Sequence, residues 1–280
     1  MPSEASIKQY ESRLRLLATA GFTDFTAQAD DVIQYLDAMA TFSNRKLYTS
    51  AILYSYGDAT PPAVYKDFIK KQFEQQNVKD DSQKLSPKQD EKYLAWSELL
   101  DVQKKLGDME KNNKTDWREY LVVSLYTLID PVRSDYGDMR VVRGQIGMGN
   151  QLVLGDARPY FLFREYKTHR VYGDVRIEIP NDLAEVISQW FSYLNKEPEF
   201  LLDQEYSGKS LSNYIRRVFE KHTGKPVGIN LIRHAKITHE LSSPKTILQK
   251  RNLARGMFHS THRQERYVIF NGTTAERNDA

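Results

Sequence analysis

The sequence predicts a mainly α-helical protein with one small antiparallel β-sheet, an α+β protein in two domains. Apolar side chains recur at the helical period through most of the 280 residues. Strand character is confined to two runs, 160–163 and 175–179, and the second run alternates apolar and polar residues. A polar stretch over 77–87 separates two groups of helical patterns, as a linker between domains does.

The first 76 residues predict a compact domain of short helices. Apolar stripes follow one another at helical spacing, at 7–17, 32–39, 47–54 and 64–73. Thr60-Pro61-Pro62 precedes the last stripe, and proline is favoured at the start of a helix. Helices this short need one another to bury their apolar faces, so we expect them to pack together as one unit.

The second domain is expected over 88–270, followed by a polar tail at 271–280 that we expect to be disordered. Ser86-Pro87 predicts the start of a helix whose apolar residues continue to Leu100. Further patterns predict helices at 121–129, 182–194, 210–221 and 230–241, and a last short helix that contains Tyr267. The two strand runs flank the polar region 167–173 and therefore predict a β-hairpin with Lys167 near its tip.

The composition indicates an intracellular protein, in the cytoplasm or the nucleus, that is not secreted. The chain has no cysteine, which excludes a disulfide framework and a thiolate metal site. It has no apolar run of the length that crosses a bilayer, so we expect no membrane partner. The N-terminus Met1-Pro2-Ser3-Glu4 lacks the basic and then apolar pattern of a signal peptide.

The distribution of charge favours a polyanionic partner. The net charge of the whole chain is only +3. Residues 1–130 carry 17 basic and 20 acidic side chains, however, whereas residues 131–280 carry 23 basic and 17 acidic ones. The basic excess therefore lies in the second domain.

Five polar side chains follow one another in the second half of the chain: Arg133, Lys167, Arg233, His259 and Tyr267. A guanidinium binds two phosphate oxygens at once, and two guanidiniums can neutralise the charge that grows on a phosphate under attack. A phenol can be the nucleophile, with an ammonium and an imidazole left for proton transfer. Singly, each residue also suits a surface or packing role, and only their joint order predicts the cleavage of a phosphodiester without metal.

The motifs around these residues resemble, in order, those of the tyrosine recombinases, also called the phage integrase family. The stretches are Pro131-Val132-Arg133-Ser134-Asp135-Tyr136, Tyr166-Lys167-Thr168, Asn230-Leu231-Ile232-Arg233 and Met257-Phe258-His259-Ser260 with Tyr267. They look like the first arginine box, the lysine-bearing hairpin, the second arginine box and the third box of that family. The resemblance covers 86–270, and the motifs look similar to those of recombinases of large eukaryotic DNA viruses and their virophages.

The resemblance implies a two-domain recombinase-like catalytic fold, with a helical N-terminal core-binding domain that clamps double-stranded DNA. It implies a site-specific recombinase or integrase that works in the host without metal, ATP or other cofactor. Four protomers would assemble around two duplexes as a homotetramer. The family's chemistry implies that Tyr267 attacks the scissile phosphate and forms a 3′-phosphotyrosyl link. Arg133 and Arg233 would bind the non-bridging oxygens, Lys167 would protonate the departing 5′ oxygen, and His259 would assist.

The sequence departs from the family at three points. Asn230 replaces the usual histidine or lysine of the second box, and its amide carries no proton charge. Tyr136 stands where an acidic residue is usual, so Asp135 is expected to orient Arg133 instead. The spacing from His259 to Tyr267 is one residue shorter than the commonest one. His234 is about 100° round the helix from Arg233, so we expect it to point away from the site.

Further basic residues are candidates for contacts with the DNA backbone: Lys209, Arg216, Arg217, Lys245, Lys250, Arg251 and Arg255. The alternative is that they lie on solvated helix faces. The four histidines at 234, 239, 259 and 262 lack a recognised ligand spacing, so no metal site is expected. The glycines at 144, 147 and 149 do not have the spacing of a dinucleotide-binding motif and predict a loop.

Two other functions remain open on the sequence. A type IB topoisomerase would share the covalent chemistry but would relax supercoiled DNA of any sequence. A non-catalytic DNA-binding protein that kept the fold would need none of the chemistry, and Asn230 is the residue that favours it. The formation of a covalent complex with nicked DNA separates this last hypothesis from the other two.

Overall fold

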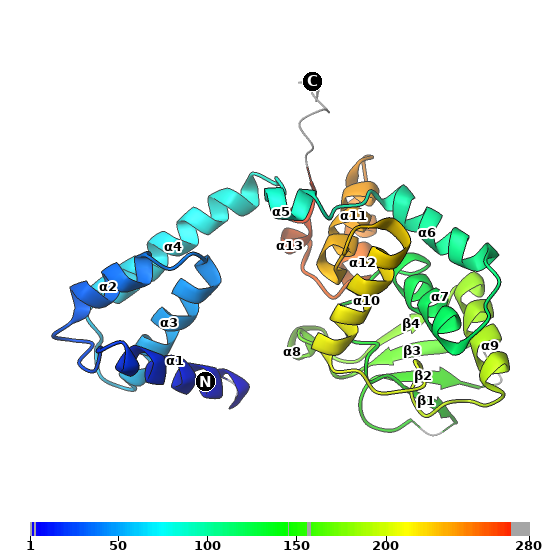
Figure 1. Ribbon diagram of the computed structural model, residues 1–280, viewed down its shortest axis with the longest axis horizontal. Helices are drawn as coiled ribbons and strands as arrows, with labels where there is room; N and C mark the ends of the chain where they lie inside the picture. Colours follow the sequence, from blue (N-terminus) through cyan, green and yellow to red (C-terminus); the bar gives the residue numbers. More distant parts are fainter. Residues whose placement is uncertain (1, 3, 145, 156–157, 270–280) are drawn as a thin grey trace. The chain divides into compact units, whose positions relative to one another are not determined.

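A computed structural model describes residues 2, 4–144, 146–155 and 158–269 of the chain (Figure 1). The chain divides into two compact units, residues 1–82 and residues 83–280, and each is described here by itself. No described helix is long and apolar enough to span a membrane.

The first unit is helical, as its apolar stripes predict. Its helices are α1 (Glu4–Thr19), α2 (Ala29–Asp37), α3 (Phe42–Ser55) and α4 (Ala63–Asp81). They bury a common core that includes Leu17, Val32, Leu36, Ile52 and Tyr65. The prediction of a linker beginning at residue 77 is wrong for 77–81, which form the end of α4. Polarity alone does not end a helix, because glutamine and lysine are good helix formers.

The second unit contains the remaining helices. They are α5 (Pro87–Asp90), α6 (Trp96–Asp108), α7 (Lys114–Thr127), α8 (His169–Tyr172), α9 (Asn181–Leu194), α10 (Gly208–Thr223), α11 (Ile229–Leu241), α12 (Ile247–Gly256) and α13 (Thr261–Glu265). The single helix expected from Ser86-Pro87 to Leu100 is wrong, because the chain forms α5 and then a separate helix, α6. The Glu98 carboxylate accepts a hydrogen bond of 2.6 Å from the Ala95 N–H and starts the second helix there. Helix α7 contacts α6, α9 and α10 and lies centrally in this unit (Figure 1).

The strands of the described residues form one four-stranded mixed sheet in the order β1-β2-β3-β4. They are β1 (Arg140–Arg143), β2 (Gln151–Leu154), β3 (Tyr160–Phe163) and β4 (Val175–Glu178). The predicted hairpin is confirmed, since β3 and β4 pair antiparallel with Phe161 opposite Ile177. The prediction of an all-antiparallel sheet is wrong, because β1 pairs parallel with β2. Gly144 and Gly149 have φ angles of 80° and 78° in the loop that returns the chain to the start of β1.

Asn150, at the end of that loop, connects two parts of the second unit. Its side chain is 1% exposed. The amide oxygen accepts hydrogen bonds of 3.0 Å from the backbone N–H groups of Arg164 and Glu165. The amide nitrogen donates to the carbonyl oxygens of Glu165 at 2.8 Å and of Asp135 at 3.2 Å. One buried side chain thereby ties the segment after α7 to the segment that leaves β3.

Candidate active site

Arg233 is fully buried in α11, with 0% of its surface exposed. Its two terminal nitrogens donate hydrogen bonds to backbone carbonyl oxygens, to Pro131 at 2.7 Å and to Met257 at 2.9 Å. These bonds hold the guanidinium between the segment after α7 and the end of α12. They supply no negative charge, however, so the charge of the buried guanidinium is not neutralised by these bonds.

A second guanidinium approaches the first. Burial, and then the charge of the neighbouring Arg133, lowers the pKa of Arg233 to about 10, while Tyr267 and Asp135 act in the opposite direction. Among the described residues, no carboxylate forms an ion pair with Arg133 or Arg233. Two like charges this close repel each other, and a bound anion would relieve that repulsion.

Asp135 shapes the backbone at Arg133. Its carboxylate accepts a hydrogen bond of 3.1 Å from the Arg133 backbone N–H, and the Tyr126 hydroxyl donates to the Arg133 carbonyl oxygen at 2.5 Å. The Arg133 side chain is only half-buried. Burial raises the pKa of Asp135, although the bond from Arg133 and the charges of both arginines lower it. Asp135 thus holds the Arg133 backbone, and the expected orientation of the Arg133 guanidinium by Asp135 stays a prediction.

Tyr267 lies against two imidazole rings. The His259 ring centroid is 4.7 Å from that of Tyr267, and the His234 ring stacks on it at 4.4 Å with an interplanar angle of 26°. His259 is 5% exposed. The expectation that Tyr267 belongs to the last helix is wrong, because α13 ends at Glu265 and Tyr267 follows in a turn.

The expectation that His234 points away from the site is also wrong. The angle between successive residues of a helix is as expected, but the segment that contains Tyr267 passes along the side of α11 to which His234 points. The Nδ1–H of His234 donates a hydrogen bond of 2.8 Å to the Tyr267 carbonyl oxygen. His234 is thus in direct contact with the candidate nucleophile.

Lys167 lies in an exposed turn between β3 and α8, which is the predicted hairpin connection. Its two neighbours anchor that turn to Phe258. The Tyr166 ring packs 4.3 Å from the Phe258 ring, and the Thr168 hydroxyl donates a hydrogen bond of 3.1 Å to the Phe258 carbonyl oxygen. The turn that carries Lys167 therefore lies next to the segment that carries His259.

Phe258 follows the C-cap residue of α12, Met257, and has a left-handed conformation with φ of 55°. The His259 N–H bonds the Ala254 carbonyl oxygen at 2.8 Å, and the Phe258 N–H bonds that of Arg255 at 3.1 Å. These two bonds form a Schellman motif, in which glycine usually takes the left-handed position. A bulky side chain there is strained, and its burial among Tyr166 and Phe163 holds it in place.

The other predicted residues divide into three groups. Asn230 is exposed in the first turn of α11. Lys245 pairs with Glu240 at 3.2 Å and Lys250 with Glu265 at 3.8 Å, so neither charge is fully available to a phosphate. Five cations are exposed and form no ion pair with a described residue: Lys209, Arg216, Arg217, Arg251 and Arg255. Burial raises the pKa of Tyr166, and the positive charge of Arg255 acts in the opposite direction. Arg255 therefore lies near the Lys167 turn.

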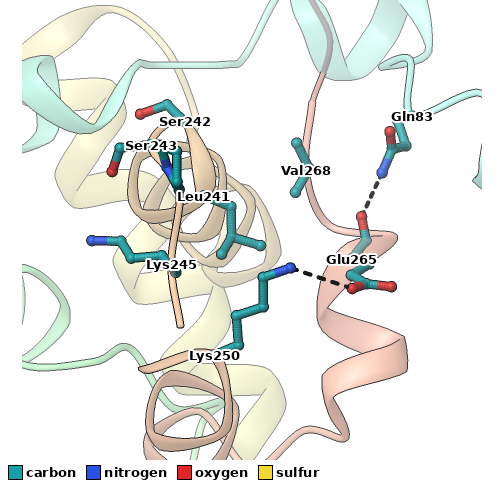
Figure 2. A pocket seen from close by; sticks show the side chains of 9 residues that line it. Gln83, Leu241, Ser242, Ser243, Lys245, Lys250, Glu265 and Val268 are labelled. Carbon is teal, nitrogen blue, oxygen red and sulfur yellow. Dashed lines mark hydrogen bonds and ion pairs between the residues drawn. The ribbon is translucent and has the colours of Figure 1, made fainter. Parts of the chain in front are cut away.

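A cavity of about 700 Å³ borders the segment just after Tyr267 (Figure 2). Its lining comprises Gln83, Leu241, Ser242, Ser243, Pro244, Lys245, Lys250, Glu265 and Val268. Figure 2 shows Gln83 and Lys250 both directed at Glu265, whose carbonyl oxygen accepts from Gln83 at 2.5 Å. These contacts hold the end of α13, from which the chain continues to Tyr267.

Sequence reasoning missed three residues that order this site: His234, Asn150 and Phe258. The second box directed attention to Asn230, three residues before Arg233, rather than to its immediate neighbour. Asn150 has no motif of its own, although it follows a glycine-rich loop. Phe258 takes a left-handed conformation that glycine usually takes, and nothing in its residue type indicated this.

A comparison with protein-family models and a comparison with curated proteins each found no match to this chain.

Proposed function

We propose that this chain is a tyrosine-type site-specific DNA recombinase or integrase, which cleaves and rejoins DNA through a 3′-phosphotyrosyl intermediate. One observation supports this most strongly. The buried Arg233 and the neighbouring Arg133 have no carboxylate partner among the described residues, and the Tyr267 ring lies 6.0 Å from the Arg233 guanidinium. Two guanidiniums without a carboxylate suit the charge of a phosphate, and a nucleophile lies next to one of them.

In the proposed reaction, the Tyr267 oxygen attacks phosphorus and the bond from phosphorus to the 5′ oxygen breaks. The phenolic proton leaves towards His259, and Lys167 gives a proton to the departing oxygen, which becomes a 5′-hydroxyl. The two arginines bind the non-bridging oxygens as negative charge grows on them. Attack of a 5′-hydroxyl on the phosphotyrosine reverses every step, so rejoining needs no ATP.

The surroundings of the site suit duplex DNA. Arg251 and Arg255 are exposed on α12, and Lys209, Arg216 and Arg217 are exposed on α10. Cations that form no ion pair within the described chain are available to backbone phosphates. Double-stranded DNA is accordingly the proposed partner, and exchange between two duplexes would require four protomers, as the resemblance implies.

The test is the capture of a covalent complex on nicked duplexes. A nick just beyond the scissile phosphate lets the short fragment diffuse away after cleavage, so the adduct accumulates. A pool with a randomised centre removes the need to know the target site. We expect an adduct in EDTA that survives denaturation, with the link mapped to Tyr267. Tyr267→Phe should form no adduct and should retain DNA binding, whereas Tyr193→Phe, in α9, should behave as wild type.

The outcomes separate the alternatives. No adduct with any duplex of the pool would contradict the proposal and favour a non-catalytic DNA-binding protein. An adduct together with relaxation of any supercoiled plasmid, but without recombinant products from paired sites, would favour a type IB topoisomerase. A strict requirement for Mg²⁺ in the cleavage step would contradict the metal-free chemistry.

A further inference from the structure

Helix α11 contacts the segment after α13 at two points that lie one helical turn apart. His234 donates a hydrogen bond of 2.8 Å from Nδ1 to the Tyr267 carbonyl oxygen. Thr238 Oγ1 accepts one of 2.9 Å from the Ile269 backbone N–H. Residues four apart on a helix lie on the same face, so His234 and Thr238 bind this segment from one face of α11.

The His234 ring adds a third contact. It stacks on the Tyr267 ring with the centroids 4.4 Å apart. Its neighbour Arg233 is buried and bonded to Pro131 and Met257, so the helix at this point is fixed relative to the guanidinium. His234 therefore directly follows Arg233, which would bind the phosphate, and contacts Tyr267, which would attack it.

We propose that His234 is a positioning residue for the nucleophile, and that with Thr238 it fixes the Tyr267 segment so that the phenol oxygen faces the phosphate held by the arginines. This role rests on the proposed function and deepens it. A carbonyl oxygen only accepts hydrogen bonds, so the Nδ1 atom of His234 must carry a proton in the cleavage-competent state. His234 acts through Tyr267 and does not take the proton role that Asn230 lacks.

The expected size of the effect follows from the cost of misplacement. A reacting group displaced by about 1 Å loses on the order of 10² in rate. Without the His234 hydrogen bond and stacked ring, the segment keeps the bond of Tyr267 to Gln264 and that of Ile269 to Thr238, but Tyr267 itself loses its contacts with His234. The cleavage rate should then fall by about 10- to 100-fold, while DNA affinity, which depends on the phosphate contacts, should not change.

The experiment measures single-turnover cleavage of a nicked duplex by the full-length chain, with DNA affinity measured separately. His234→Ala should cleave about 10- to 100-fold more slowly with an unchanged Kd. His234→Asn keeps a donor close to the place of Nδ1, and should recover part of the rate. The matched control is His239→Ala, an exposed histidine of the same helix, which should behave as wild type. Thr238→Val removes the second contact and should lower the rate by a smaller factor.

A modified substrate separates positioning from proton transfer. A bridging sulfur in place of the 5′ oxygen leaves as a thiolate and needs no proton. Lys167→Ala should therefore regain its rate on this substrate, because Lys167 is the proposed proton donor. His234→Ala should keep the same deficit on both substrates, because its defect lies in the attacking group. Recovery of His234→Ala with the sulfur substrate would overturn the proposal.

The remaining outcomes are also decisive. Failure of wild type to form any adduct would remove the proposed function, and this inference with it. An adduct with wild type, but equal cleavage rates for wild type, His234→Ala and Thr238→Val, would overturn this inference alone. If His234→Ala fails to fold, as seen by circular dichroism, the cleavage rates of His234→Asn and Thr238→Val decide. Rates below that of wild type at an unchanged Kd would support the proposal, and rates equal to that of wild type would overturn it.

Discussion

The ring of Phe258 packs against the ring of Tyr166 with their centroids 4.3 Å apart, and this contact joins two separate parts of the candidate site. On one side, Phe258 precedes His259 and ends α12 with φ of 55°. On the other side, Tyr166 precedes Lys167 in the turn after β3. The strained aromatic residue thus couples the position of the candidate general acid to that of the candidate base.

Two substitutions at Phe258 should reverse the usual ranking of alanine and glycine. Phe258→Ala removes a buried ring, and such losses destabilise by about 3–5 kcal/mol. Phe258→Gly removes the same ring but also removes the left-handed strain, which costs about 1–2 kcal/mol for a residue with a Cβ. The glycine variant should therefore be the more stable of the two. Urea unfolding measures both free energies, and a more stable alanine variant would show that position 258 is not strained.

Most of the fold could be predicted from the sequence, because local patterns determine the elements. The helix predicted at 230–241, for example, is α11 (Ile229–Leu241), and the alternation at 175–179 correctly predicted a strand in a hairpin. Strands β1 and β2 were not predicted, since strand character was expected only at 160–163 and 175–179, and their parallel pairing was not predicted either. It depends on how the loop 144–150 returns the chain, and glycines allow several routes.

The sequence selected the residues of the candidate site but not the contacts among them. Motif order selected Arg233 and Tyr267, because their chemical groups have few other uses together. It did not select His234, since a helical angle says where a side chain points and not which segment passes there. For the same reason Lys245 and Lys250 were expected to face phosphates, whereas they pair with Glu240 and Glu265.

Arg233→Lys should lose activity even though the charge is kept. The guanidinium bonds two carbonyl oxygens, of Pro131 and Met257, in a fixed planar geometry that an ammonium does not reproduce. We expect cleavage to fall by about 10²–10³, the size of losing one preorganised donor. Stability should fall by about 1–3 kcal/mol, because a buried carbonyl loses its partner. The half-buried Arg133, changed in the same way, should cost less stability, and equal costs at both positions would contradict this account.

The salt dependence of DNA binding should distinguish the exposed cations from the paired ones. Each lost phosphate contact changes the slope of log K against log salt by about 0.9. Arg251→Ala and Arg255→Ala should each reduce the steepness of this slope by about that amount. The matched control is Lys245→Ala, just before α12, because the Lys245 ammonium pairs with Glu240. This substitution should change the slope less. A titration from about 50 to about 200 mM salt measures the slopes, and equal changes in all three variants would refute the distinction.

Asp135→Asn should change how stability depends on pH, and the direction follows from the raised pKa of this carboxyl group. Burial is the main cause, so the folded state holds the proton to a higher pH than the unfolded state, whose value lies near 3.8. The contribution of the protonated group to stability is therefore complete below the unfolded pKa and is lost as the pH rises through the folded pKa. Asparagine does not titrate and still accepts the hydrogen bond from the Arg133 N–H. The stability of wild type relative to Asp135→Asn should fall as the pH rises from about 4 and should level off above the raised folded pKa, as measured by urea unfolding at several pH values. A relative stability that rises with pH would mean that the two arginines dominate over burial at this carboxylate.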